Sequence, residues 1–417
     1  MRLTFFFVLF LGVTIQTQAQ TLTIEDCYEK ARQNYPIIKQ KELVSKSKEF
    51  SIANVQSGYL PQVTLNGQAT YQSDVTRLPG SATLVEPLSK DQYKLYVELN
   101  QAIYDGGITK RNSAIQETVA QVEDQKIEVE LHKIKDRINQ IYFGTLLINE
   151  QLIQNEIVQK DLMANLSKME SAIRNGTAFK TNADILQAEI LKTDQRKVEL
   201  KSARKTYLEM LGMFIHETLS ESASLQKPSF LVVTEQPLIT RPEIQLYKYQ
   251  SQLYVAQQQL TNTRIAPRVS LFAQGGYGRP GLNMLLNQFD TYYLGGIRLS
   301  WNVSGFYNSG REKQLLDLNL QSLNLQQEIF LFNTNLSLRQ QSAEINKLDE
   351  LLGIDEKLIE LRSRIKNTAK AQLDNGVITA NDYLRELNAE DQANQNLIVH
   401  QIQKLMTQYT QQVTSGK

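Results

Sequence analysis

The residues that could carry out chemistry are few and scattered. The chain has one cysteine, Cys27, and three histidines, His132, His216 and His400, with no HxxxH or CxxC companions that would suggest a metal site or a nucleophile. The run at 275–278, Gly-Gly-Tyr-Gly, looks like a phosphate loop but lies within an expected strand and lacks a following helix and Lys-Ser/Thr. We therefore expect no catalytic residue, no metal and no cofactor, and we expect that the protein is not an enzyme.

Composition points to long helices. The chain has 417 residues, of which 41% are hydrophobic and 21% are charged. Its 45 Lys and Arg almost cancel 44 Asp and Glu, which argues against the broad basic field of a nucleic-acid binder. Only 9 Pro and 20 Gly occur, fewer than a turn-rich fold would need.

The N-terminus has the pattern of an export signal. A basic start at Met1-Arg2 is followed by an apolar run from Phe5 to Ile15, a short polar stretch and Ala19. The run is too short to span a membrane, so residues 1–19 are expected to be a signal peptide cleaved after Ala19. No later segment has 18 consecutive apolar residues, so a membrane-embedded form would have to cross the lipid with strands.

The sequence contains an internal duplication. Six identities share an offset of 206 positions, and they are Pro36/Pro242, Pro61/Pro267, Val63/Val269, Leu65/Leu271, Gln68/Gln274 and Tyr71/Tyr277. Farther along, Asn175-Gly176 and Asn375-Gly376 pair at an offset of 200, and an Asp-x-Leu triplet follows each, at Asp184 and at Asp382. We expect a first structural repeat at 20–230 and a second at 231–417, each with the order helix, two strands and a long helical hairpin.

Four strands are predicted by apolar and polar alternation, at about 61–72, 92–104, 267–278 and 290–303. Pro61 and Pro267 are each expected to end the preceding helix and to stand at the start of the strand that follows. A length of about ten residues suits a tilted membrane strand, and aromatic residues near the strand ends suit an interfacial girdle: Tyr71, Tyr93, Tyr277, Tyr293 and Trp301. Taken alone, the strands fit a soluble antiparallel sheet equally well.

Two helices are predicted to be too long for a globular domain. Between Gly107 and Asn175 the chain has no Pro, and apolar residues recur at spacings of four and three. A helix of roughly 65 to 70 residues would be on the order of 100 Å long. Each helix is expected to end at Asn-Gly, with the chain turning near 175–181 and 375–381 into a returning helix, so that two long antiparallel coiled-coil hairpins form. An ordinary coiled coil would not explain the four inserted strands.

The strands of one chain could not span a membrane alone, because every backbone amide and carbonyl in lipid needs a partner and an open four-stranded sheet leaves its edges unpaired. Copies of the chain could close the sheet, and three copies would give a shared barrel of twelve strands. The number three does not follow from periodicity.

The ordered motifs resemble the TolC family of outer-membrane efflux proteins. They are Thr23 to Ala31 with Asn34-Tyr35-Pro36, Tyr59-Leu60-Pro61, Tyr104-Asp105-Gly106-Gly107, Asn175-Gly176, Arg241-Pro242-Glu243-Ile244, and Asn375-Gly376 with Asp382-Tyr383-Leu384. The resemblance implies a homotrimer in the outer membrane of a Gram-negative bacterium, with a transmembrane β-barrel and a periplasmic α-barrel. It also implies an exit duct for a tripartite efflux pump or a type I secretion system. The hairpin turns, Asn175-Gly176 and Asn375-Gly376, would dock a periplasmic adaptor that an inner-membrane transporter feeds.

The resemblance further implies that Asp382, and with it Asp184, line a periplasmic aperture. For Asp184 to match Asp382, the first turn is expected to carry two extra residues. The alternative for each Asp is a charge that the helix N-terminus favours. Two departures from the family pattern are Ile378, where some members have a basic gate residue, and Arg385, where a second acidic residue is found. The competing functions are a soluble periplasmic coiled-coil adaptor and a stand-alone porin, for which four strands per chain are too few.

Overall fold

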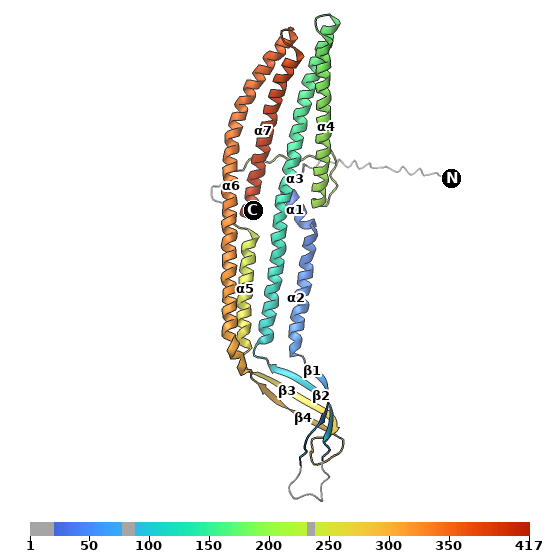
Figure 1. Ribbon diagram of the computed structural model, residues 1–417, viewed down its shortest axis with the longest axis vertical. Coiled ribbons are helices and arrows are strands. Elements are labelled where there is room, and N and C mark those ends of the chain that lie inside the picture. Colours follow the sequence, from blue (N-terminus) through green and yellow to red (C-terminus); the bar gives the residue numbers. More distant parts are fainter. Residues whose placement is uncertain (1–20, 77–87, 232–237) are drawn as a thin grey trace, which may run out of the picture. The chain divides into compact units, whose positions relative to one another are not determined.

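The computed structural model describes residues 21–76, 88–231 and 238–417, so the expected signal peptide at 1–19 lies outside the described residues (Figure 1). The chain divides into two compact units. The hairpin unit comprises residues 1–38, 130–241 and 333–417, and the sheet unit comprises residues 39–129 and 242–332. Two long helices contribute residues to both units.

The element order repeats along the chain. The first half contains α1 (Ile24–Asn34), α2 (Gln40–Gln56), β1 (Gln62–Tyr71), β2 (Asp91–Tyr104), α3 (Ile108–Arg174) and α4 (Lys180–Ile215). The second half contains α5 (Pro242–Thr263), β3 (Arg268–Arg279), β4 (Asp290–Ser300), α6 (Phe306–Asp374) and α7 (Ala380–Ser415). Short 3-10 turns lie at Pro36–Lys39, Ser57–Tyr59 and Val303–Gly305. The two long helices have 67 and 69 residues, and the two returning helices have 36 residues each.

The fourth strand ends earlier than its sequence pattern predicts. We expected 290–303, but β4 stops at Ser300 and Val303 begins a 3-10 turn that leads into α6. The indole Nε1 of Trp301 donates to the carbonyl of Ile265 at 2.9 Å, a contact between the segment after β4 and the end of α5. The apolar residues at 301 and 303 therefore continue the alternation without continuing the strand.

The four strands form one antiparallel sheet in the order β1-β2-β3-β4 (Figure 1). Leu65 lies opposite Val97, and Leu271 lies opposite Ile297. Because directly opposed residues lie on the same side of a sheet, the register collects most apolar side chains on one side and most polar ones on the other. The register shifts once, between Ala102 and Tyr104.

Asp105 fixes the point at which β2 becomes α3. Its carboxylate accepts hydrogen bonds from Gly107 N at 2.8 Å, from Thr109 N at 2.7 Å and from the Tyr59 hydroxyl at 2.8 Å. Burial alone would raise the pKa of this carboxyl, but the hydrogen bonds outweigh it and lower the pKa to about 2. Gly106 has φ +75°, and a Cβ there would lie 2.9 Å from that of Ala266, so both the backbone and the space require glycine.

The helices of the sheet unit contact one another in the order α2, α3, α5, α6. Lys41 of α2 pairs with Glu128 of α3, and Arg111 of α3 donates to Gln259 of α5 at 2.6 Å. Arg264, just after α5, pairs with Glu312 of α6 at 3.1 Å. In this layer α2 and α6 are therefore the edge helices.

The hairpin unit has an apolar core to which both hairpins contribute. The core includes Leu162 of α3, Leu186 of α4, Leu373 of α6 and Leu387 of α7. None of the helices in the described ranges has a segment apolar enough, over a sufficient length, to cross a membrane.

Candidate functional site

The sheet has two chemically different faces. The apolar face carries exposed side chains, which are Val63, Leu65, Leu95, Val97, Leu99, Leu271, Ile297 and Leu299. The polar face carries Gln62, Thr64, Asn66, Gln68, Thr70, Lys94, Glu98, Asn100, Ser270, Gln274 and Arg298, together with a few aromatic residues and the exposed Leu294. A soluble sheet would cover its apolar face with a second layer, whereas here these side chains are 40–73% exposed.

An ion pair on the polar face joins the middle of β2 to the end of β4. Glu98 of β2 and Arg298 of β4 lie 2.9 Å apart across β3. The other carboxylate oxygen of Glu98 accepts from Gln274 Nε2 at 2.7 Å, and the guanidinium lies 4.5 Å from the ring centre of Phe272. Sequence reasoning missed this cluster, because its members are far apart in the chain and share a face only once the register is known.

The predicted girdle residues fall at the two ends of the sheet. Tyr71 ends β1, Tyr93 lies near the start of β2, Tyr277 lies near the end of β3, and Tyr293 lies near the start of β4, so these four share one end. Trp301 lies beyond β4 at the opposite end and is 58% exposed. The predicted entry residues Pro61 and Pro267 each directly precede a strand, β1 and β3 respectively.

Both edges of the sheet unit lack a partner among the described residues. β1 pairs only with β2, and β4 pairs only with β3. The edge helix α6 presents exposed apolar side chains at spacings of 3, 7, 4 and 3, at Leu315, Leu318, Leu325, Ile329 and Phe332. The edge helix α2 presents Leu43 and Phe50, which are 62% and 66% exposed. Spacings of three, four and seven are those of a heptad seam, which requires a facing helix.

The two hairpin tips have the same backbone design. Gly176 has φ +73° and Gly376 has φ +72°. In the first turn Thr177 N donates to Ala172 O at 2.9 Å, and in the second Val377 N donates to Gln372 O at 2.8 Å. This is the αL cap that satisfies the last carbonyls of a helix. Asn175 and Asn375 directly follow the last residues of α3 and α6.

The expected difference in turn length is wrong. The turn segments 175–179 and 375–379 have equal length, since α4 begins at Lys180 and α7 at Ala380. Counted from the turn, the counterpart of Asp382 is Asn182, and Asp184 corresponds to Leu384. Two residues along a helix correspond to a rotation of about 200°, so Asp184 and Asp382 point in different directions. The Asp-x-Leu triplets matched in sequence but not in register.

Asp382 takes part in a capping box at the start of α7. Its Oδ2 accepts from Thr379 N at 3.2 Å and from Thr379 Oγ1 at 2.7 Å, and Thr379 Oγ1 in turn accepts from Asp382 N. The hydrogen bonds from Thr379 lower the pKa of Asp382 below its usual range. Phe179, the equivalent residue before α4, makes no such side-chain cap. The capping role alone accounts for an acidic residue here, and the aperture role stays a proposal.

Replacing Asp382 by alanine should loosen the first turn of α7, because the loss of a capping interaction costs about 1 kcal/mol. Amide hydrogen exchange over 378–386 should quicken several-fold, whereas Asp184→Ala, which removes a carboxylate outside any capping box, should leave exchange at its own helix start nearly unchanged. Equal effects of the two substitutions would show that capping is not the role of Asp382.

Close to the tips, a buried polar cluster joins the two hairpins. The Tyr383 hydroxyl donates to Asp161 Oδ2 at 2.9 Å and accepts from Asn165 Nδ2 at 2.8 Å. Asp161 of α3 also pairs with Lys370 of α6, and Lys366 lies 4.0 Å from Asp161. Tyr383 is fully buried. We call Asp161, Asn165, Lys370 and Tyr383 the hairpin clamp.

The pH response of the clamp follows from Asp161. Burial would raise the pKa of this carboxyl, but hydrogen bonds from Lys370 and Tyr383 and the nearby lysine charges hold it below its usual value. A carboxyl with a lowered pKa in the folded state stabilises the fold above its unfolded pKa of about 4, and this contribution is lost as the pH falls through the folded value. The clamp should therefore be intact at neutral pH.

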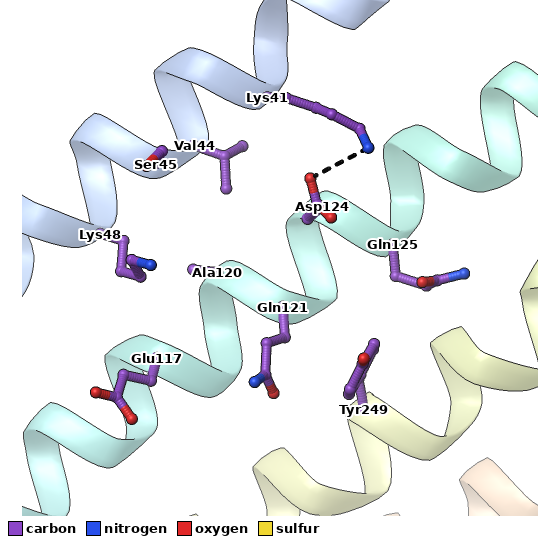
Figure 2. Close-up of a pocket in the computed structure, with 10 residues that line it drawn as sticks. All are labelled: Lys41, Val44, Ser45, Lys48, Glu117, Ala120, Gln121, Asp124, Gln125 and Tyr249. Atoms are coloured by element: carbon purple, nitrogen blue, oxygen red, sulfur yellow. Dashed lines mark ion pairs between the residues drawn. The ribbon is translucent and has the colours of Figure 1, made fainter.

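A polar groove of about 420 Å³ lies among α2, α3 and α5 (Figure 2). Lys41 lies 3.8 Å from Asp124 in it, and Lys48, Glu117 and Tyr249 also line the groove. Its opposite charges come from facing helices, which fits helix pairing better than the binding of one charged ligand. Among the residues that the structure describes, no group of three or more His, Cys, Asp or Glu could hold a metal ion.

Neither the protein-family models nor the sequences of curated proteins include a match to this chain. Solved structures do match. The chain is similar to the outer membrane protein VceC of Vibrio cholerae, with 13% identity, a TM-score of 0.67 and coverage of 94% of this chain and 96% of that one. It is also similar to the CmeC outer membrane channel of Campylobacter jejuni, with 14% identity, a TM-score of 0.65 and coverage of 94% and 86%.

The MtrE outer membrane channel of Neisseria gonorrhoeae, captured in its open state, is similar at 13% identity, with a TM-score of 0.65 and coverage of 94% and 89%. At these identities the likeness establishes the fold. The predicted fold, mainly α-helical with long helical hairpins and four strands per chain, is therefore confirmed.

Proposed function

We propose that this chain, which has the fold of these outer-membrane channels, is an exit duct in the outer membrane of a Gram-negative bacterium. It would assemble as a homotrimer of the TolC type, with a shared twelve-stranded barrel in outer-membrane lipid and a helical barrel in the periplasm. Transport would be passive, and the chain would not act as an enzyme.

One observation carries the proposal: within the described part of the chain, the sheet has an exposed apolar face, a polar face and two unpaired edges. Lipid would cover the apolar face, and water would fill the space in front of the polar face. Because an open edge cannot exist in lipid, the free edge of β4 in one copy would pair with β1 of the next. The edge helices α6 and α2 would meet in the same way, their exposed apolar side chains forming the contact.

The partners of the duct follow from its position. A duct without an energy source needs an inner-membrane transporter, and a periplasmic adaptor would connect the two by docking on the tips at Asn175-Gly176 and Asn375-Gly376. The pump would be a tripartite efflux system or a type I secretion system. A carboxylate ring at Asp382 would attract cations at the periplasmic aperture.

The purified protein should insert into planar bilayers and give discrete, stepwise conductance, and it should require detergent for extraction from cells. The expected alternative, a soluble periplasmic adaptor, predicts extraction without detergent and no conductance. The decisive variant is a folded oligomer in which the hairpin clamp has been weakened. If it still gives no conductance, the proposal is overturned, because a closed tip could no longer explain the absence of pores.

A further inference from the structure

We propose that the Glu98–Arg298 pair keeps its part of the polar face free of net charge, so that this part of the barrel favours neither cations nor anions. The inference rests on the proposed function, because it requires the polar face to line a water-filled duct. It adds one feature to that duct, a ring of three internally neutralised pairs, one from each copy, each running from the middle of β2 to the end of β4.

The pair is built into the face. Both carboxylate oxygens of Glu98 are engaged, one by Arg298 and the other by Gln274. The Arg298 guanidinium also lies over the Phe272 ring, at 4.5 Å from the centroid, which is a favourable cation–π distance. The Glu98 side chain is 17% exposed and that of Arg298 is 42% exposed. Both charges are thus held in place, and the cation is the more open to passing ions.

No other charged residue of β1 to β4 lies level with Glu98 on the polar face, whereas Arg268, opposite Ser300, lies two residues from the position that faces Arg298. In β1 to β4, the other charged residues on that face are Lys94, four residues from Glu98 along β2, and Arg268 and Asp290, each at the first position of a strand. Removal of Arg298 would therefore leave a ring of three carboxylates, and removal of Glu98 would leave a ring of three guanidinium groups, each near Arg268 of its own chain. Rings of charged side chains in a pore select ions by sign.

The test measures reversal potentials across a bilayer in a KCl gradient at low salt, where screening is weak. Arg298→Gln should raise the permeability of K⁺ relative to Cl⁻ by about two- to fivefold, and Glu98→Gln should lower it by a similar factor. The double variant, Glu98→Gln with Arg298→Gln, should return close to the unsubstituted protein. As a matched control, Arg279→Gln breaks the Asp91–Arg279 pair, which lies on the apolar face, and should leave the ratio unchanged.

A second measurement tests which face of the sheet meets water, and it leaves Glu98 and Arg298 unchanged. Thr64 lies opposite Glu98 on β1, on the polar face, whereas the next residue, Leu65, lies on the apolar face. A water-soluble sulfonate thiol reagent should lower the conductance of Thr64→Cys and not that of Leu65→Cys. The natural Cys27 is buried, so the background should be low.

Failure of the ion pair's role and failure of the duct would give different results. Conducting pores whose ion ratio is the same in Arg298→Gln, Glu98→Gln and the unsubstituted protein would overturn the role of the pair and leave the duct standing. Conducting pores in which Leu65→Cys reacts and Thr64→Cys does not would reverse the faces and overturn the inference as well. Absence of pores from the unsubstituted protein would overturn the proposed function, and the inference with it.

Discussion

Replacing both Ile329 and Phe332 of α6 by glutamate is expected to convert the oligomer into monomers. These side chains are 60% and 68% exposed in the single chain and would be covered by α2 of the neighbouring copy. Burying one such side chain is worth about 1.5–3 kcal/mol, and a carboxylate in its place must also be desolvated. Because a ring of three has three such contacts, the effect repeats around it. Light scattering in detergent should show the mass of one chain, and conductance should disappear.

The matched control is Asn324→Glu, which adds one negative charge to the same helix at an exposed position outside the apolar row. This variant should keep the mass of the oligomer and its conductance. An unchanged mass for the Ile329→Glu, Phe332→Glu variant would mean that the α6 edge is not the contact between copies. The association would then have to depend on the strand edges alone.

The fold was largely predictable because periodicity is local. Alternation predicted all four strands to within a few residues, and the apolar series at Ile127, Leu131, Ile134 and Ile138 proved to be buried. The end of β4 was missed because Trp301 and Val303 keep the alternation while the backbone has already turned toward α6. The alternation of apolar and polar side chains indicates which face of a strand is apolar. It does not indicate where the backbone hydrogen bonds of the sheet end.

The candidate sites were less predictable because they depend on register. The Asp184 assignment came from matching triplets, but the turn geometry makes Asn182 the counterpart of Asp382. Glu98 and Arg298 are 200 residues apart in the sequence and meet only because β3 lies between their strands. Helix α6 has two rows of apolar side chains, one that packs on helices of its own chain and one that is exposed. Both rows have heptad spacing, so the sequence could not tell them apart.

Replacing Tyr383 of the hairpin clamp by phenylalanine is expected to weaken the contact between the two hairpins. The substitution keeps the buried ring but removes the hydroxyl, so that Asp161 loses a donor and the Nδ2 of Asn165 loses its acceptor. The Oδ1 of Asn165 already has no hydrogen-bond partner. Leaving buried polar groups unpaired costs about 1–3 kcal/mol. The hairpins should therefore separate more often at this level.

Tyr142→Phe is the control that separates local loosening from general loss of stability. Tyr142 is also fully buried in the hairpin unit, and its hydroxyl donates to the carbonyls of Leu22 and Gln226 at 2.9 and 2.7 Å, so the same atom is removed far along the chain from the tips. Amide hydrogen exchange over 365–390 should quicken by about ten- to a hundredfold in Tyr383→Phe, in line with a loss of about 1.4–2.8 kcal/mol, and stay near its original rate in Tyr142→Phe. If the tips gate the duct, Tyr383→Phe should also raise the resting conductance. Equal exchange at 365–390 in the two variants would mean that the Tyr383 hydroxyl contributes only general stability and does not hold the hairpins together.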